Sequence, residues 1–116
     1  FEPELIGPSD YQNLFVGWGS TYSIIKDALD QLNLKESAFL HFKQVYPLSE
    51  KTGDFLKKAE RIIMIENNAT GQFGKLLEEE TGYKVSDYIL KYDGLPFYVD
   101  ELAERIKKTV SEKGGQ

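Results

Sequence analysis

The stretch Arg61-Ile62-Ile63-Met64-Ile65 decides the fold, because one charged residue is followed by four apolar ones. A short, continuous apolar run that is rich in β-branched side chains is typical of a strand buried on both faces. Strands of this kind lie in the middle of parallel sheets that are covered by helices. The run therefore predicts the central strand of an α/β fold.

Strands and helices alternate on the amino-terminal side of this run. Residues 13–16 form an aromatic and β-branched strand pattern, which ends in a glycine-bracketed turn. From Tyr22 the apolar residues recur at helical spacing, and Ser20 is the expected N-cap of that helix. Residues 37–42 return to a strand pattern, and residues 48–58 predict a shorter helix.

The same alternation continues on the carboxyl-terminal side. Residues 70–81 predict a helix that ends at Gly82, and residues 88–92 predict a strand. Residues 99–110 carry apolar side chains at i, i+3, i+4, i+7 and i+11, which predicts a last helix. Alternation of this kind favours right-handed βαβ crossovers. We therefore expect a three-layer α/β/α sandwich with a mainly parallel sheet.

One domain accounts for the length of the chain. Its 116 residues, 41% of them hydrophobic, are enough for a single core. We expect this domain to span residues 10–110, with residues 1–9 as an entering linker or an edge strand and residues 111–116 as a flexible tail. The first residue is Phe1 and the only methionine is Met64, so we expect the chain to begin inside a longer polypeptide.

The composition excludes several kinds of site. The chain has no cysteine, which removes disulfides, thiolate zinc sites, cysteine nucleophiles and cysteine-held iron–sulfur clusters. Its 14 basic and 19 acidic residues give a net charge of −5, which disfavours nucleic acid as a partner. The longest apolar run, residues 62–65, is far shorter than the ~20 residues that cross a bilayer. We expect a cytoplasmic protein without a membrane or nucleic-acid partner.

The loops at the carboxyl ends of the strands are the expected position of a ligand site, because ligands of parallel sheets bind there, near the point where the strand order reverses. The turn after the first of these strands holds the candidates Gly17, Trp18, Gly19, Ser20 and Thr21. Its glycines permit a tight turn, and its hydroxyl groups can cap a helix or contact an anion. The turn lacks the third glycine of a dinucleotide site and the lysine of a phosphate loop, so a plain strand–turn–cap structure is favoured over nucleotide binding.

A second polar cluster follows the central strand. Its candidates are Glu66, Asn67, Asn68, Thr70, Gly71 and Gln72. Side-chain amides at such a position tie down a loop and start a helix, and this structural interpretation is favoured. They also offer donors and acceptors to a partner domain or a small ligand, so this second interpretation stays open.

No catalytic centre and no metal site is expected from the residue types. His41 is the only histidine, and without cysteine beside it a strand-end histidine bonded to the backbone is favoured over a metal ligand or a catalytic triad. No spacing brings two acidic side chains together for acid–base chemistry. The residues alone are compatible with part of an enzyme, with a free-standing nucleotide- or phosphate-binding module, and with a structural dimerisation domain.

Four strings of residues stand at the loops of the carboxyl ends in a characteristic order and spacing. They are Gly17-Trp18-Gly19-Ser20-Thr21-Tyr22, His41-Phe42-Lys43-Gln44-Val45-Tyr46-Pro47, Glu66-Asn67-Asn68-Ala69-Thr70-Gly71-Gln72 and Lys91-Tyr92-Asp93-Gly94-Leu95-Pro96-Phe97. Together they resemble the C-terminal domain of the alpha subunit of 2-oxoacid:ferredoxin oxidoreductases, over about residues 8–108. Within that family they look more like the 2-oxoglutarate type than the pyruvate type.

The resemblance implies a transketolase C-terminal-like domain within an enzyme that oxidatively decarboxylates a 2-oxoacid with coenzyme A. Such an enzyme forms an acyl-CoA and passes electrons through thiamine diphosphate and iron–sulfur centres to ferredoxin. The resemblance places these groups in other domains or subunits, so we expect no cofactor in this chain and no activity of the chain by itself. The implied partners are the rest of the alpha subunit, the beta subunit and, through the whole complex, ferredoxin.

The resemblance carries over no catalytic residue, because it places the chemistry outside the matched region. The loops at the carboxyl ends are then interpreted as a surface between domains or subunits. The leading contact candidates are Trp18, Asn67, Asn68 and Gln72. Two departures from the expected family pattern, Tyr98-Val99 at the start of the last helix and Gly53 within the middle helix, concern helix boundaries.

Overall fold

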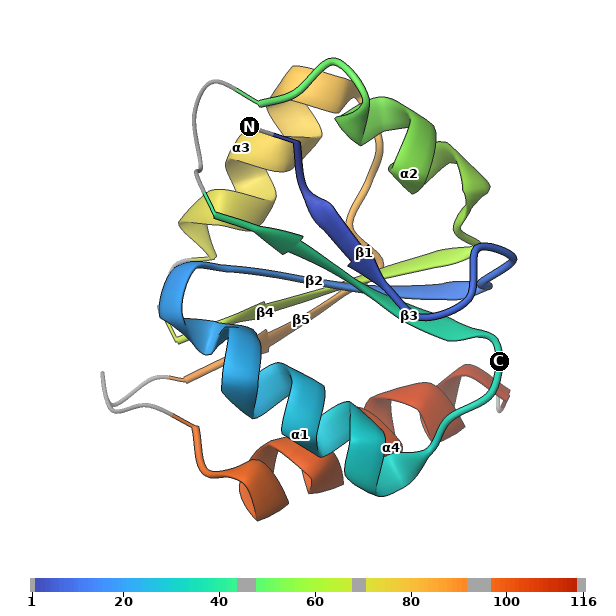
Figure 1. Ribbon diagram of the computed structural model, residues 1–116, viewed down its shortest axis with the longest axis vertical. Coiled ribbons are helices and arrows are strands. Elements are labelled where there is room, and N and C mark those ends of the chain that lie inside the picture. Colours follow the sequence, from blue (N-terminus) through green and yellow to red (C-terminus); the bar gives the residue numbers. More distant parts are fainter. Residues whose placement is uncertain (1, 44–47, 68–70, 92–96, 115–116) are drawn as a thin grey trace.

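A mainly parallel sheet forms the middle layer of the molecule (Figure 1). It is seen in a computed structural model, which describes residues 2–43, 48–67, 71–91 and 97–114. The elements in these residues are β1 (Glu4–Ile6), β2 (Asn13–Trp18), the 3₁₀ helix η1 (Gly19–Thr21), α1 (Tyr22–Leu32), β3 (Ser37–Phe42), α2 (Thr52–Lys58), β4 (Arg61–Glu66), α3 (Gln72–Thr81), β5 (Asp87–Leu90) and α4 (Val99–Gly114).

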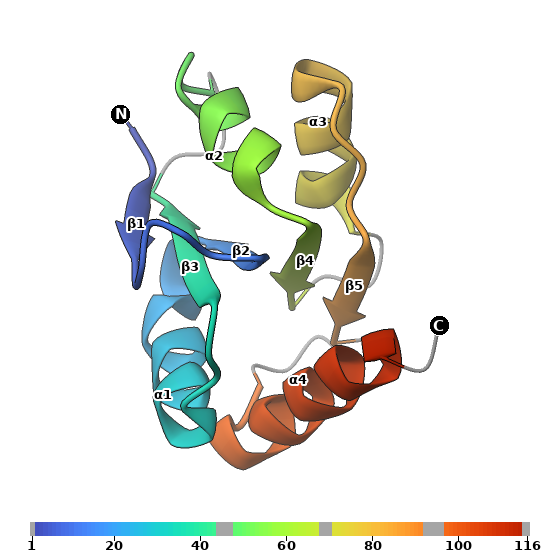
Figure 2. The same cartoon turned by 90° about the vertical axis from the view of Figure 1, so that its right-hand side faces the viewer.

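The strands lie in the order β1-β3-β2-β4-β5. β2 to β5 are parallel, and β1 pairs antiparallel with β3 at one edge. The helix that follows β2 and the helix that follows β4 cover opposite faces of the sheet (Figure 2). The connections that leave β2 and β4 therefore run to opposite faces of the sheet, so the topological switch point lies between these two neighbouring strands.

Helices cover both faces of the sheet, with α1 and α4 on one face and α2 and α3 on the other (Figures 1 and 2). An apolar core fills the space on each side. The core under α2 and α3 includes Leu14, Val16, Leu40, Phe42, Met64, Phe73 and Leu77. The core under α1 and α4 includes Phe15, Ile25, Phe39, Ile63, Ile65, Leu102 and Ile106. The predicted three-layer α/β/α sandwich is confirmed.

The strand β4 is buried on both faces, as its apolar run predicts. Ile62 and Met64 contribute to one core, Ile63 and Ile65 contribute to the other, and all four are at most 5% exposed. β4 has a paired strand on each edge and helices over each face, so an alternating pattern would place polar side chains in a core.

The start of α1 differs from the expectation. β2 continues through Gly17 to Trp18, because both residues pair with β3. A 3₁₀ turn then precedes α1, and the N-cap of α1 is Thr21 instead of Ser20. The hydroxyl group of Thr21 donates to the carbonyl oxygen of Trp18, so the side chain closes the turn and does not cap the helix.

The helices α2 and α3 begin later than the sequence pattern indicates. α2 begins at Thr52 instead of residue 48. α3 begins at Gln72 instead of residue 70, and its N-cap is Gly71 with φ 64°. A residue in the left-handed region cannot continue a right-handed helix, so the first helical turn starts after it.

The two ends of the described chain are both part of regular elements. β1 pairs Leu5 with Leu40, so a part of residues 1–9 forms an edge strand. β5 spans Asp87–Leu90, and α4 continues past residue 110 to Gly114, because the polar residues that follow are compatible with a helix. The domain boundaries at residues 10 and 110 stay a prediction. Within the described ranges, no helix combines the length and the apolar character that crossing a membrane requires.

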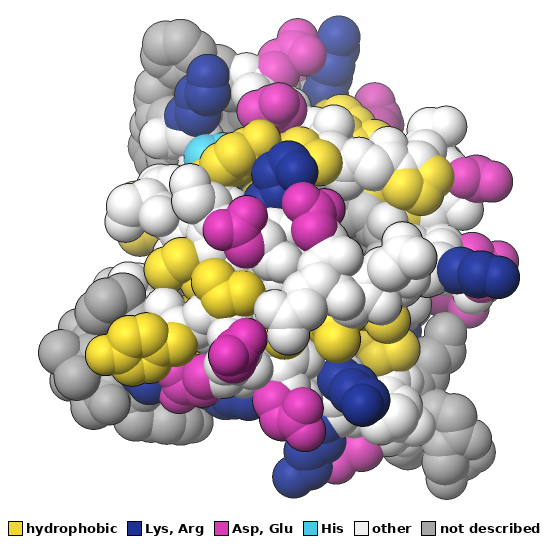
Figure 3. All heavy atoms as spheres, turned by 60° about the horizontal axis from the view of Figure 1, so that its bottom comes forward, with side chains coloured by type: hydrophobic (Ala, Val, Ile, Leu, Met, Phe, Trp, Pro, Cys, Tyr) yellow, Lys and Arg dark blue, Asp and Glu magenta, His cyan; other side chains and the backbone are white. Residues whose placement is uncertain are grey.

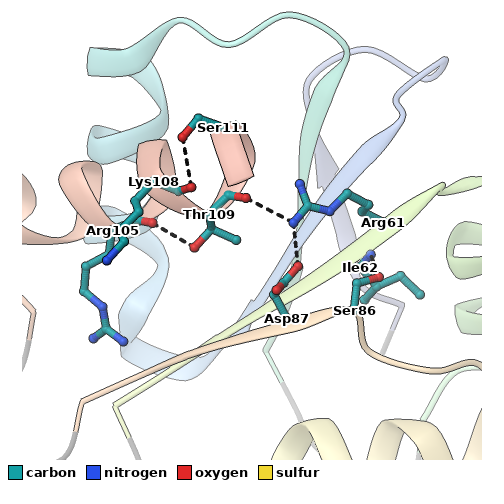
Figure 4. A network of polar contacts seen from close by, with 8 residues as sticks. All are labelled: Arg61, Ile62, Ser86, Asp87, Arg105, Lys108, Thr109 and Ser111. Carbon is teal, nitrogen blue, oxygen red and sulfur yellow. Dashed lines mark hydrogen bonds and ion pairs between the residues drawn. The ribbon is translucent and has the colours of Figure 1, made fainter. Parts of the chain in front are cut away.

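Arg61 ties the amino edge of the sheet to α4 (Figure 4). Its Nη2 atom donates to Oδ2 of Asp87 at 2.6 Å and to the carbonyl oxygen of Thr109 at 3.1 Å. Beside this pair, Oγ of Ser86 accepts a hydrogen bond from the N–H group of Ile62 at 3.0 Å. The Nη2 atom of Arg61 is therefore bonded within the domain, whereas its Nη1 atom is buried without a hydrogen-bond partner among the described residues.

Candidate functional site

The two candidate loops lie next to each other at the switch point. The ring centroid of Trp18, at the end of β2, lies 6.1 Å from that of Phe73 in the first turn of α3. The ring of Phe73 meets Phe42, at the end of β3, edge-on at 5.1 Å. We call the surface formed by residues 17–21, by the described residues of 66–72 and by the start of α4 the carboxyl edge, which is on the left of Figure 1.

The turn after β2 is held by close packing. A Cβ atom on Gly17 would lie 2.5 Å from Cδ1 of Ile25, so any larger residue here would displace the buried side chain of Ile25. Gly19 has φ 65°, a conformation that residues with side chains rarely adopt. The hydroxyl group of Thr21 donates to the carbonyl oxygen of Trp18 at 2.8 Å. These contacts define one backbone path for the turn and leave the ring of Trp18 at the surface.

His41 supports the same turn from the neighbouring strand β3. Its side chain is 6% exposed, and Nε2 lies 2.9 Å from the carbonyl oxygen of Gly19. A carbonyl oxygen only accepts, so Nε2 carries the proton and donates. Tyr22 meets the imidazole ring edge-on at 5.0 Å. The prediction of a strand-end histidine bonded to the backbone is confirmed.

Glu66, at the end of β4, caps α3 with its side chain. Its Oε1 atom accepts a hydrogen bond from the N–H group of Phe73 at 3.1 Å, and Oε2 accepts from Gly74 at 2.9 Å. The residue is 2% exposed, and its own carbonyl oxygen accepts from the N–H group of Lys91 at 3.1 Å. Glu66 is therefore part of the fold, and its carboxylate is not presented to a ligand.

This cap weakens the phosphate-binding alternative. A helix N-terminus binds an anion through free N–H groups and the positive end of its dipole. Two of these groups in α3 already bond to the carboxylate of Glu66, whose negative charge repels a second anion. At α1 the 3₁₀ turn over Gly19–Thr21 stands in front of the helix, so its first helical N–H groups are not preceded by an open loop.

Tyr88 covers the start of α3 from β5. A Cβ atom on Gly74 would lie 2.4 Å from Cε2 of this ring, and one on Gly71 would lie 3.1 Å from it. Burial raises the pKa of Tyr88, and the carboxylates of Glu78 and Glu66 raise it further, so the hydroxyl group stays protonated. A side chain at position 74 would thus displace the ring of Tyr88, whereas position 71 favours glycine mainly because its φ is 64°.

The structure divides the candidate residues into two groups. Four side chains are exposed, namely Trp18, Ser20, Asn67 and Gln72. Four residues are buried within the fold, namely Gly17, Thr21, Glu66 and Gly71, and Gly19 is half-buried. Asn68 and Thr70 lie outside the described residues, as do parts of the strings around residues 44–47 and 92–96. The exposed group is the part of the candidate site that can reach a partner.

The carboxyl edge includes Tyr98, a residue that the sequence analysis treats only as a departure from the family pattern. Its side chain is 75% exposed, directly before the first residue of α4. The N–H group of Tyr98 donates to Oε1 of Glu101 at 3.3 Å, and Oε2 of Glu101 accepts from Nζ of Lys91 at 2.6 Å. The hydrogen bond from Lys91 is the main cause that lowers the pKa of Glu101. The signal in the sequence is an aromatic residue where helices prefer Ser, Thr, Asp or Asn.

The described residues of the carboxyl edge present exposed aromatic and amide side chains. Within the described ranges, no three His, Cys, Asp or Glu side chains lie close enough together to hold a metal ion. A cavity of about 180 Å³ lies away from this edge, between β1, the end of α1 and the start of β3, where it is lined partly by Ile6, Leu29 and Phe39. The exposed aromatic and amide groups therefore favour contact with another polypeptide.

Comparisons with known proteins find alpha subunits of an oxidoreductase. The chain is 34% identical over 111 residues to subunit alpha of 2-oxoacid:ferredoxin oxidoreductase 1 from Aeropyrum pernix, which covers 91% of this chain and 17% of that protein. It is 28% identical over 110 residues to the corresponding subunit from Sulfurisphaera tokodaii, which covers 94% of this chain and 17% of that protein. The chain thus spans 17% of the length of these relatives. No protein-family model matches it.

Two solved structures have the same fold. The alpha chain of a probable 2-oxoacid ferredoxin oxidoreductase from Thermoplasma acidophilum is 28% identical, with a TM-score of 0.65, and the match covers 95% of this chain and 97% of that chain. A 2-oxoglutarate:ferredoxin oxidoreductase from Magnetococcus marinus, solved with 2-oxoglutarate, coenzyme A and succinyl-CoA bound, is 23% identical, with a TM-score of 0.79 over 93% of this chain and 19% of that chain.

These findings confirm the resemblance that the sequence strings indicate. The chain is homologous to a segment of alpha subunits that are parts of an oxidoreductase complex. The names of the homologues refer to 2-oxoacids in general, so the preference for the 2-oxoglutarate type stays a prediction.

Proposed function

We propose that this chain is the C-terminal, transketolase C-terminal-like domain of the alpha subunit of a 2-oxoacid:ferredoxin oxidoreductase. The observation that carries the proposal is the 34% identity to such an alpha subunit over 91% of this chain. The solved alpha chain from Thermoplasma acidophilum supports it, because 97% of that chain is matched by this one.

The whole enzyme would oxidatively decarboxylate a 2-oxoacid with coenzyme A and pass the electrons to ferredoxin in the cytoplasm. Thiamine diphosphate and iron–sulfur clusters are the cofactors that this chemistry implies. The composition of the chain does not fit an iron–sulfur cluster, and the described start of α3 does not fit a diphosphate. The chain has no cysteine to ligate a cluster, and the amides of α3 that would suit a diphosphate bond to Glu66. The chemistry then belongs to the rest of the alpha subunit and to the beta subunit.

Within that enzyme the domain serves assembly, and the carboxyl edge is its contact surface. The exposed ring of Trp18 supports this role, because aromatic side chains are enriched at surfaces that bind protein, and the exposed candidates Ser20, Asn67 and Gln72 beside it carry no charge. The subunits from Aeropyrum pernix and Sulfurisphaera tokodaii are several times longer than this chain, and in such a subunit further polypeptide is available to cover the edge.

Reconstitution of activity from separate parts tests the proposed function. The 116-residue chain alone is expected to leave 2-oxoacids unchanged. Coenzyme A-dependent reduction of ferredoxin is expected only when the remaining alpha subunit and the beta subunit are added to it. Turnover by this chain alone, or full turnover by the other parts without it, would contradict the proposal.

Contact residues can be tested in the same assay. The double variant Asn67→Ala, Gln72→Ala is expected to weaken assembly or turnover, because both side chains are exposed on the carboxyl edge. Gln31→Ala is the matched control, since it removes an exposed amide near the far end of α1. Unchanged assembly together with unchanged turnover of the double variant would remove these two residues from the contact surface.

Stabilisation of the chain by an added ligand distinguishes the proposed function from the alternative of a free-standing nucleotide- or phosphate-binding module. A ligand at about 100 times its Kd raises the free energy of unfolding by roughly 2.7 kcal/mol. We expect adenine nucleotides and inorganic phosphate to leave the free energy of unfolding unchanged, because the carboxylate of Glu66 already bonds to the N–H groups at the start of α3. A saturable shift with either ligand would favour the module, and the solution mass of the chain alone tests a dimerisation domain.

A further inference from the structure

We propose that Trp18 and Tyr98 are two anchor residues by which the carboxyl edge binds the remaining part of the alpha subunit. This inference rests on the proposed function and adds the residues that carry the contact. In the part of the chain that the structure describes, these two are the large hydrophobic side chains that are exposed, at 39% and 75%. Trp and Tyr are also the residue types that dominate the binding energy of protein interfaces.

Both residues lie on the same edge of the sheet. Trp18 ends β2, and Tyr98 directly precedes α4, which returns antiparallel to β5 and so begins at the carboxyl ends of the strands. Figure 3 views the face covered by α1 and α4, on which hydrophobic side chains lie in several separate groups among charged and polar ones. At the opposite edge Nη2 of Arg61 donates to Asp87 and to the carbonyl oxygen of Thr109.

Trp18 is presented as a rigid anchor. Its backbone is held by the pairing of β2 with β3 and by the hydrogen bond from Thr21. One part of its ring packs against Phe73, which packs against Phe42, and the remainder faces solvent. A ring that is already ordered in the free protein loses little conformational entropy when a partner covers it.

The presence of tyrosine at position 98 is not explained by capping of α4. Its carbonyl oxygen accepts the first helical hydrogen bond, from Leu102 at 2.9 Å, so Tyr98 is the N-cap of the helix. Glu101 accepts a bond from the N–H group of Tyr98, which is one half of a capping box. A serine at this position would complete the box, whereas tyrosine supplies no capping oxygen and exposes an aromatic ring. The residue therefore costs the free domain stability, as expected for a side chain retained for binding.

The partner that fits these anchors is a protein surface with two apolar recesses, supplied by the remaining alpha subunit. The chain spans 17% of the length of the subunits from Aeropyrum pernix and Sulfurisphaera tokodaii, so most of a subunit of that length is available to cover the edge. The exposed side chains of Ser20 and Asn67 on the same edge are uncharged, whereas Lys43 after β3 and Asp100 in the first turn of α4 are exposed charges of opposite sign. An apolar centre with a polar surround that lacks an excess of positive charge is typical of a protein interface and unlike a site for nucleic acid.

The variant Tyr98→Ser separates binding from stability because the two are expected to move in opposite directions. Completion of the capping box should raise the thermal midpoint of the 116-residue chain by about 3–5 °C. Loss of the ring should weaken binding to the remaining alpha subunit, supplied as a separate polypeptide, by about tenfold or more. Trp18→Ala should weaken binding to a similar extent, and the emission of the only tryptophan in the wild-type chain should shift to shorter wavelength on binding.

Tyr83→Ser is the matched control. Tyr83 follows α3 at the amino edge, where it packs against the core under α2 and α3. The same replacement there should lower the thermal midpoint and leave binding unchanged. Calorimetric titration measures the binding, and thermal unfolding of each free variant measures its stability.

The outcomes distinguish this inference from the proposed function. If the variants Trp18→Ala and Tyr98→Ser both bind the remaining alpha subunit with the affinity of the wild-type chain, Trp18 and Tyr98 are not anchors, and the proposed function is unaffected. Failure of the wild-type chain to bind the remaining alpha subunit overturns both. Self-association of the wild-type chain that both variants abolish overturns the choice of partner in favour of a second copy. Weaker binding by Tyr98→Ser together with a higher thermal midpoint supports the inference.

Discussion

The ring of Tyr88 on β5 lies directly against Gly74 of α3, so that a Cβ atom at position 74 would lie 2.4 Å from Cε2 and 2.7 Å from the hydroxyl oxygen of Tyr88. The close approach seats the start of α3 over the ends of the central strands. In this position the N–H group of Gly74 lies 2.9 Å from the carboxylate of Glu66. Packing of the ring and capping of the helix therefore depend on each other.

Gly74→Ala is expected to lower the free energy of unfolding by about 1–3 kcal/mol, because the added methyl group collides with the ring of Tyr88. Helix propensity alone predicts a gain of about 1 kcal/mol from the same change. Equilibrium unfolding in urea measures the sign. In a Tyr88→Ala background the loss should shrink, and an equal loss in both backgrounds would contradict the steric explanation.

Glu66→Gln is expected to destabilise the domain by about 2–4 kcal/mol, because an amide group replaces a carboxylate that accepts from two buried N–H groups. One of those groups then faces an NH₂ donor. Glu79→Gln, at an exposed position of the same helix, is the control and should change stability by less than about 0.5 kcal/mol. Similar denaturation midpoints for the two variants would show that Glu66 does not act as a cap.

His41→Phe is expected to loosen the turn after β2. Phenylalanine preserves the aromatic contact with Tyr22 and removes the donor to the carbonyl oxygen of Gly19, at a cost of about 1 kcal/mol. Acrylamide quenching of Trp18 reports on the turn, because this is the only tryptophan in the chain. Quenching should increase in His41→Phe and fall back towards the wild-type value in His41→Gln, whose amide can donate. Identical quenching in all three proteins would exclude a role of His41 in holding the turn.

Glu101 makes the stability of the domain depend on pH in the acidic range. The hydrogen bond from Lys91, and then that from the N–H group of Tyr98, lowers the pKa of Glu101 below its ordinary value of 4.5. A carboxyl group with a lowered pKa stabilises the folded state above the ordinary value, and this contribution is lost as the pH falls through the folded pKa.

Thermal unfolding between pH 6 and pH 3 measures this contribution. The thermal midpoint of the wild-type chain should fall more over that range than the midpoint of Glu101→Gln. Glu104→Gln, an exposed position on the same helix, should follow the wild-type curve. Parallel curves for the wild type and Glu101→Gln would show that the contact with Lys91 does not contribute.

Much of the fold was predictable because its signals are local. The run Ile62 to Ile65 indicates a strand buried on both faces, and α1 and α4 follow from apolar residues at helical spacing. Boundaries were less predictable, since they depend on contacts between elements. β2 continues to Trp18 because β3 pairs with it there, and α3 starts at Gln72 because Gly71 adopts a left-handed conformation.

The position of the candidate site was also predictable, since parallel strands place their following loops at one edge. The role of each residue at that edge was not. Glu66 belongs to the same polar cluster as Gln72, yet the structure uses its carboxylate as a helix cap. Tyr98 is a helix boundary in the sequence and a largely exposed aromatic ring in the structure.

The amino-acid sequence by itself determined the order of the elements, the layered architecture and the edge at which a partner is sought. Each of these follows from apolar spacing between residues that are close along the chain. Only the tertiary structure decided which polar residues at that edge are available. Glu66 and Asn67 are neighbours in sequence, but Glu66 is buried and Asn67 is exposed. The carboxylate of Glu66 accepts hydrogen bonds from N–H groups seven and eight residues further along the chain. The difference arises from the docking of α3 onto β4 and β5, a contact between segments that no local pattern describes.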